Sequence, residues 1–165
     1  MTTGSSSCNH QPEPGDHSVS SLDLDKSDYA CLTAARFAFL QFAAPNQQCW
    51  LTVMLASDTL FEGEHHAETF RRVCAVVHEM RLSRKDTMRF SNPRCQRCSA
   101  ILTEHERHLI QMIQAVRRGE MSKARISAML LCEGHSIDRL LKATDDLARI
   151  LPAVEDRALI PSLQS

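Results

Sequence analysis

The sequence predicts an all-α protein, a compact bundle of about five to six helices. Apolar residues recur at steps of three and four through most of residues 28–152, which is the spacing that aligns side chains along one face of a helix. Alternating runs of β-branched residues and Asn-Gly hairpin signals are missing, so the pattern does not indicate a sheet. A chain of 165 residues is long enough for one domain with a buried core.

Composition divides the chain into three parts. Residues 1–27 are rich in Ser, Pro and Asp and carry few large apolar side chains, which predicts a disordered arm. The arm is acidic, because five carboxylates and one lysine between Met1 and Asp28 give a net charge of −4. Residues 28–152 form the predicted helical domain, and residues 153–165 follow it as a short tail.

The first predicted helix is the most apolar segment of the chain. Ser27 or Asp28 can cap its start, and Pro45 ends it, so we expect it to run to about Ala44. Its sequence, YACLTAARFAFLQFAA, is apolar on nearly every side. A helix of this kind is normally buried in a core or against another subunit. The apolar N-terminal helices therefore predict either the core or a self-association surface, such as that of a homodimer.

Two further helices complete the apolar region 28–82. Asn46 is expected to cap a helix that runs through Trp50 to Ala56. A clearly amphipathic helix is expected over residues 67–82, where apolar side chains follow at three- and four-residue steps: Phe70, Val73, Cys74, Val77 and Met80. Residues 83–94 then form a basic connector that ends in a turn at Ser91-Asn92-Pro93.

The next predicted helix starts at a capping box, in which Thr103 caps the helix and Glu106 reaches back to the cap. Its buried stripe is expected to contain Leu102, Leu109, Met112, Ile113 and Val116. Glu104, Glu106 and His108 are expected to form its exposed face.

Two more helices close the domain. Ser122 can cap a helix that continues to about Glu133, and Gly134 suits the left-handed residue that ends it. Ser136 starts the last helix, which is expected to reach Leu151 before Pro152.

A Cys-x-x-Cys pair, Cys95 and Cys98, precedes these helices and is the usual source of two ligands in a zinc site. If the helices on either side of Gly119 are antiparallel, Cys132 returns to the level of about residue 107, at about 1.5 Å per residue. Cys132 is therefore the predicted third ligand. The fourth is His105, which lies on the buried stripe, or His135, which forms a Cys-x-x-His pair with Cys132. Residues 95–152 are thus predicted to be metal-held helices.

Other uses of these cysteines are weighed beside zinc. An iron–sulfur cluster fits the same spacing, and a redox-active thiol pair is favoured by Arg94 and Arg97 beside Cys95 and Cys98, because cations lower a thiol pKa. Buried thiols without any metal are the simplest alternative, since a buried thiol behaves as a small apolar group.

The basic segment 81–97 is a candidate binding surface. Six cations and one aspartate give it a net charge of +5. Its central side chains are predicted to contact nucleic acid or an acidic partner, with Phe90 available to stack on a base: Arg84, Lys85, Arg89, Arg94 and Arg97. The alternative is a solvated connector whose arginines pair with carboxylates of neighbouring helices or of the acidic arm.

These patterns together favour a non-enzymatic protein. No Ser/His/Asp set, phosphate-binding glycine loop or paired-carboxylate cleft can be named, and a zinc ion with four protein ligands has no open position for catalysis. An apolar signal sequence and a run long enough to cross a membrane are missing, which predicts a cytoplasmic protein. We expect a zinc-stabilised regulatory or adaptor protein that binds protein and nucleic acid, with a cysteine-based or iron–sulfur redox sensor as the alternative.

Overall fold

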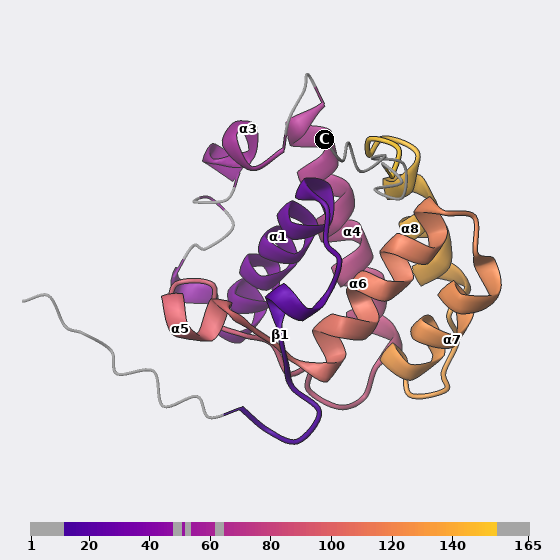
Figure 1. Cartoon of the computed structure of the whole chain (residues 1–165), viewed down its shortest axis with the longest axis horizontal. Helices are drawn as coiled ribbons and strands as arrows, with labels where there is room; N and C mark the ends of the chain where they lie inside the picture. The colour runs from indigo at the N-terminus through magenta and orange to yellow at the C-terminus, as the bar shows by residue number, and fades with distance from the viewer. Residues whose placement is uncertain (1–11, 48–50, 52–53, 62–64, 155–165) are drawn as a thin grey trace, which may run out of the picture.

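A computed structural model of the chain describes residues 12–47, 51, 54–61 and 65–154, and every structural statement below concerns these residues (Figure 1). Most of them are helical, which confirms the predicted all-α class. The helices are α1 (Lys26–Ala43), α3 (Ser57–Leu60), α4 (His66–Ser83), α5 (Gln96–Ser99), α6 (Glu104–Arg117), α7 (Met121–Leu131) and α8 (Asp138–Ala148). Short 3-10 turns occur at η1 (Val19–Ser21) and η2 (Pro45–Gln47), and two strands, β1 (His17–Ser18) and β2 (Ile101–Leu102), pair with each other. The helix predicted from Asn46 to Ala56 lies partly outside the described residues, which omit 48–50 and 52–53.

The core lies where α1, α4, α6 and α8 pack together (Figure 1). The wide apolar surface of α1 is buried there, including Leu32, Ala35 and Phe39. Much of the α1 surface that could have served for self-association is therefore covered by α4 and α6 of the same chain. Of the two predicted roles for this helix, the structure shows burial in the core.

Helix α1 begins earlier than its sequence suggests. Asp25, rather than Ser27 or Asp28, is its N-cap: its carboxylate accepts a hydrogen bond from the backbone N–H of Asp28, and the Asp28 carboxylate accepts one from Asp25 in return. A capping box satisfies two of the N–H groups that a helix start leaves without partners. Asp28 is thereby placed inside the helix, where it is nearly inaccessible to solvent.

The predicted N-terminal arm is partly folded. From residue 12 onward the chain is described, and His17 and Ser18 pair antiparallel with Leu102 and Ile101. The Val19 N–H extends this pairing to the Ala100 carbonyl, at 2.9 Å. Backbone hydrogen bonds do not depend on side-chain type, which is why a composition poor in apolar residues did not reveal the pairing. The part of the arm before residue 12 lies outside the described residues.

Several local signals in the second half of the bundle are confirmed, but Ser122 and Ser136 do not cap α7 and α8, whose N-caps are Glu120 and Ile137. The Thr103–Glu106 capping box is present at the start of α6. Gly119 has a φ of +73° in the turn between α6 and α7, and Gly134 has a φ of +77° after α7, both in the left-handed region that favours glycine. Helices α6 and α7, which the turn at Gly119 connects, pack against each other as predicted. Helix α8 is shorter than expected at both ends, beginning at Asp138 and ending at Ala148.

Candidate functional site

The residues predicted to bind zinc are not brought together. Within the described part of the chain, no three His, Cys, Asp or Glu side chains form a group that could hold a metal ion. Cys98 lies on α5 and Cys132 follows α7, and Figure 1 places these two helices at opposite sides of the molecule. No such group therefore includes three of the predicted ligands Cys95, Cys98, Cys132, His105 and His135, and zinc or iron–sulfur binding by them stays a prediction of the sequence.

The path of the basic connector explains this separation. The Arg84 side chain pairs with Glu133 just after α7, at 2.7 Å. Farther along, the Arg89 N–H donates to His105 Nδ1 at 2.9 Å, and the Ser91 N–H donates to Glu106 Oε1 at 3.0 Å. The connector thus runs from the end of α7 to the first turn of α6 before it reaches Cys95. The hairpin prediction placed Cys132 near the start of α6, but it took no account of the connector contacts there.

The two candidate histidines have other partners. His105 Nδ1 accepts the hydrogen bond from Arg89, and His135 Nδ1 lies 2.9 Å from the Cys132 carbonyl oxygen. Burial lowers the pKa of His105, and the charges of Arg84 and Arg89 lower it further. His105 is therefore held neutral, and its unprotonated Nδ1 acts as an acceptor for the connector.

We expect the protein to lose stability as the pH falls through about 6.5, the ordinary pKa of histidine. The folded-state pKa values of His105 and His108 lie below this value, in both cases chiefly because of burial. The unfolded chain therefore binds more protons than the folded chain in this range, so that the free energy of unfolding rises with pH. Urea unfolding at pH 5.5 and 7.5 measures the difference.

The variant His105→Gln should reduce this pH dependence. The glutamine side-chain carbonyl can accept a hydrogen bond from the Arg89 N–H, and unlike histidine it does not bind a proton in this pH range. An unchanged pH dependence in His105→Gln would show that His105 does not contribute. His78→Gln, at an exposed position of α4, is the matched control.

The thiols also bear on the redox alternative. Burial raises the pKa of Cys132, and it raises the pKa of Cys74 to about 11 and that of the fully buried Cys31 further still. The thiolate is the reactive form of cysteine, so a raised pKa disfavours thiol chemistry at these positions. A sensor that used Cys132 as one of its thiols receives no support from this environment.

The most constrained polar site is a buried ion pair that joins α1 to α6. Arg36 Nε donates to Glu106 Oε1 at 2.7 Å, and neither side chain is more than 3% exposed. The remaining Arg36 nitrogens donate to the carbonyl oxygens of Ser99 and Ile101. Glu106 also accepts from the backbone N–H groups of Ser91 and Thr103. The prediction that Glu106 lies on the exposed face of α6 is wrong.

The prediction that His108 lies on the exposed face of α6 is also wrong. His108 is buried, with 9% of its surface accessible, while Glu104 one turn earlier is exposed. The pattern of apolar residues could not show that Glu106 is buried, because its partner Arg36 is 70 positions away in the chain. The ion pair is buried on all sides and fully engaged with backbone groups, so it organises the fold and offers no surface to a ligand.

The basic segment is partly neutralised by the chain itself. The Arg84 side chain is only 4% exposed and pairs with Glu133. Arg89 pairs with Glu13 and with Asp16, whose carboxylate oxygens lie 2.7 and 2.8 Å from Arg89 Nη2. Lys85, Arg94 and Arg97 are exposed. At least two of the five residues predicted to contact nucleic acid or an acidic partner, Arg84 and Arg89, are thus paired within the molecule, and Arg89 is paired with the N-terminal acidic arm.

Helix α7 presents an exposed apolar surface that the sequence analysis did not identify. Ala124, Ala128 and Leu131 are fully buried against the bundle. On the opposite side of the same helix, Ile126, Met129 and Leu130 are 61%, 52% and 53% exposed. We call these three residues the outer face of α7. Their spacing of three and four was visible in the sequence, where it could have shown that α7 is apolar on two sides.

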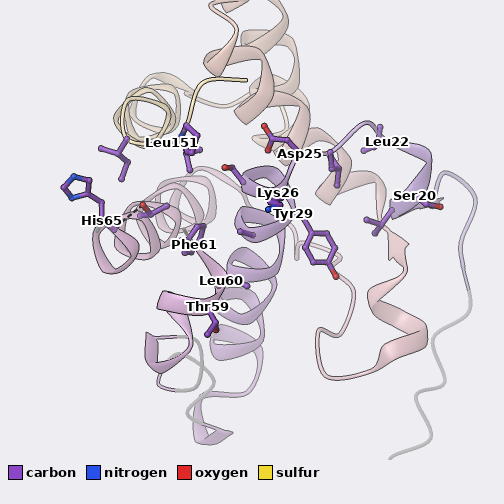
Figure 2. Close-up of a pocket in the computed structure, with 17 residues that line it drawn as sticks. Ser20, Leu22, Asp25, Lys26, Tyr29, Thr59, Leu60, Phe61, His65 and Leu151 are labelled. Carbon is purple, nitrogen blue, oxygen red and sulfur yellow. Dashed lines mark hydrogen bonds between the residues drawn. The ribbon is translucent and has the colours of Figure 1, made fainter. Parts of the chain in front are cut away.

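An apolar groove of about 670 Å³ is lined by the start of α1, by residues 59–61 and by residues 150–152 (Figure 2). Figure 2 shows Tyr29, Leu60, Phe61 and Leu151 around it. Two of its polar groups already have partners: the Asp25 carboxylate accepts from Asp28 and Arg117, and the Thr69 hydroxyl donates to the His65 carbonyl. Binding sites for small molecules usually combine apolar walls with convergent polar groups, so this groove does not by itself indicate a ligand.

Every helix in the described ranges is too short or too polar to cross a lipid bilayer. Comparison with known proteins found no matching family, no similar curated protein and no similar solved structure.

Proposed function

We propose that this protein is a non-enzymatic regulatory or adaptor protein that binds another polypeptide on the outer face of α7. The observation that carries the proposal is the exposure of Ile126, Met129 and Leu130 on a helix whose inner side is completely buried. A helix that is apolar on two opposite sides is normally covered on both of them. Contiguous apolar surface on a folded domain is typical of protein interaction sites.

The neighbouring residues suit a peptide or a helix as the ligand. Three apolar side chains at positions i, i+3 and i+4 match the way in which amphipathic helices pack against each other. Lys123 and Arg125 are exposed beside the outer face and can form the polar rim that surrounds such interfaces.

The zinc site, the iron–sulfur alternative and nucleic-acid binding are not part of this proposal. The candidate ligands are dispersed, and Arg84 and Arg89 already pair with carboxylates. These three assignments stay predictions of the sequence without support from the described geometry.

A photoreactive amino acid at position 126 of the full chain tests the proposed function. We expect irradiation of cells that contain this variant to give a covalent adduct of discrete mass, because a bound polypeptide would lie within reach of position 126. Placing the same group at Leu82 provides the matched control, since Leu82 is an exposed apolar residue (55%) on α4. Absence of any adduct at 126, or the same adducts from 126 and 82, would contradict the proposal.

A further inference from the structure

Two residues of the outer face of α7, Ile126 and Leu130, lie at equal distances along the sequence from Ala128. Ile126 lies two residues before Ala128 and Leu130 lies two residues after it. In an antiparallel pair of identical helices centred on residue 128, Ile126 of one copy is therefore opposite Leu130 of the other. Such a two-fold contact needs only one surface that is complementary to itself.

One charged residue near the start of α7 and one just after its end are related by the same symmetry. Lys123 lies five residues before Ala128, is 70% exposed and pairs with Glu120 of the same chain at 2.9 Å. Glu133 lies five residues after Ala128 and two residues beyond the end of α7, with its side chain 24% exposed. The Glu133 carboxylate is held in place at the surface by Arg84 and by the backbone N–H groups of Lys85 and Asp86. An antiparallel pair brings the Lys123 ammonium of each copy toward the ordered Glu133 carboxylate of the other.

We propose that two copies of this chain form a homodimer in which their α7 helices pack antiparallel about a two-fold axis near Ala128. The proposal rests on the proposed function, because it names the polypeptide that covers the outer face of α7. The apolar centre is expected to supply most of the binding free energy, and the two Lys123–Glu133 contacts set the direction of pairing.

The alternative arrangements match the surface less well. A parallel pair would place Lys123 against Lys123 at one end and Glu133 against Glu133 at the other. In the antiparallel pair the two lysines are separated by ten residues along the helix, or about 15 Å, which exceeds the screening length in physiological salt. The macrodipoles of antiparallel helices also attract each other. Figure 1 places α7 at the edge of the molecule, where a second copy can approach it.

Sedimentation equilibrium of the full chain over a range of micromolar concentrations tests the dimer. We expect the wild-type protein to reach twice the mass of one chain. Ile126→Asp should raise the dimer dissociation constant about a hundredfold, because each copy would bury a carboxylate against apolar side chains. Leu82→Asp is the matched control and should leave the constant unchanged. Far-UV circular dichroism verifies folding, and Ile126→Ser is the milder variant if Ile126→Asp does not fold.

Lys123→Glu tests the direction of pairing. We expect it to weaken the dimer about tenfold, since it replaces two attractive contacts with two repulsive ones. In a parallel pair it would exchange one like-charge contact for another and change little. A dimer unaffected by Lys123→Glu would therefore overturn the antiparallel arrangement.

Three further results would overturn the homodimer: a monomeric wild-type protein, a dimer that persists in both position-126 variants, or equal weakening by Leu82→Asp. A monomer that still forms an adduct with another protein at position 126 would remove the homodimer and leave the proposed function standing. A monomer without adducts at that position would remove both.

Discussion

Replacing Glu106 by alanine is expected to lower the free energy of unfolding by about 3–5 kcal/mol, the cost typical of breaking a buried ion pair from one side. The Arg36 guanidinium would remain buried without its carboxylate. The backbone N–H groups of Ser91 and Thr103 would lose their acceptor as well. Since small domains are stable by only about 5–15 kcal/mol, a marked fall in melting temperature should accompany the change. Equilibrium unfolding in urea measures it.

Glu104→Ala is the matched control for this experiment. Glu104 lies in the same first turn of α6, but half of its side chain is exposed, so its removal is expected to cost less than about 1 kcal/mol. A double-mutant cycle with Arg36→Met should show strong coupling. The loss of unfolding free energy in the double variant should be smaller, by at least about 2 kcal/mol, than the sum of the losses in the two single variants. Equal costs for Glu104→Ala and Glu106→Ala would rule out the buried pair as a main determinant of the fold.

The second large effect is expected from Arg117→Met, which should cost about 3 kcal/mol for the same physical reason. Arg117 donates to Asp28 at 2.6 Å, to Asp25 at 2.8 Å and to the Pro152 carbonyl, and its side chain is 2% exposed. These contacts join the start of α1, the end of α6 and the segment after α8. Methionine would keep much of the packing of the side chain but leave the buried Asp28 carboxylate without its cation.

Arg118→Met provides a control one residue away. Arg118 is exposed at the end of α6, and substitution there is expected to change the unfolding free energy by no more than about 0.5 kcal/mol. Thermal and urea unfolding of both variants measure the contrast. If Arg118→Met were as destabilising as Arg117→Met, the loss would reflect the general charge of this region and not the contacts to Asp25 and Asp28.

The two polar sites explain how α1 is placed on α6. Arg36 pairs with Glu106 near the start of α6, and Asp28 pairs with Arg117 at its end. Apolar packing between two helices tolerates small changes in register, whereas a buried charge without its partner is costly. We therefore expect the two ion pairs to select one register for α1, with the apolar residues between them supplying the core.

The sequence alone determined several features that depend on neighbours a few residues apart. Thr103 and Glu106 predicted the start of α6, Gly119 predicted the turn to α7, and the apolar stripe of α6 was identified correctly. These signals act within one or two helical turns, where chain geometry leaves few alternatives. The all-α class follows from the same local patterns.

Only the tertiary structure decided which distant side chains meet. It placed Arg36 against Glu106, paired the N-terminal strand with residues 101–102, and set Cys98 and Cys132 apart. A cysteine or a glutamate has the same local signature whether it is a ligand, a buried partner or a surface group. Its role depends on which remote segments the fold brings together. The free energy of that step is set by contacts along the whole chain, and the spacing of a short motif does not reveal it.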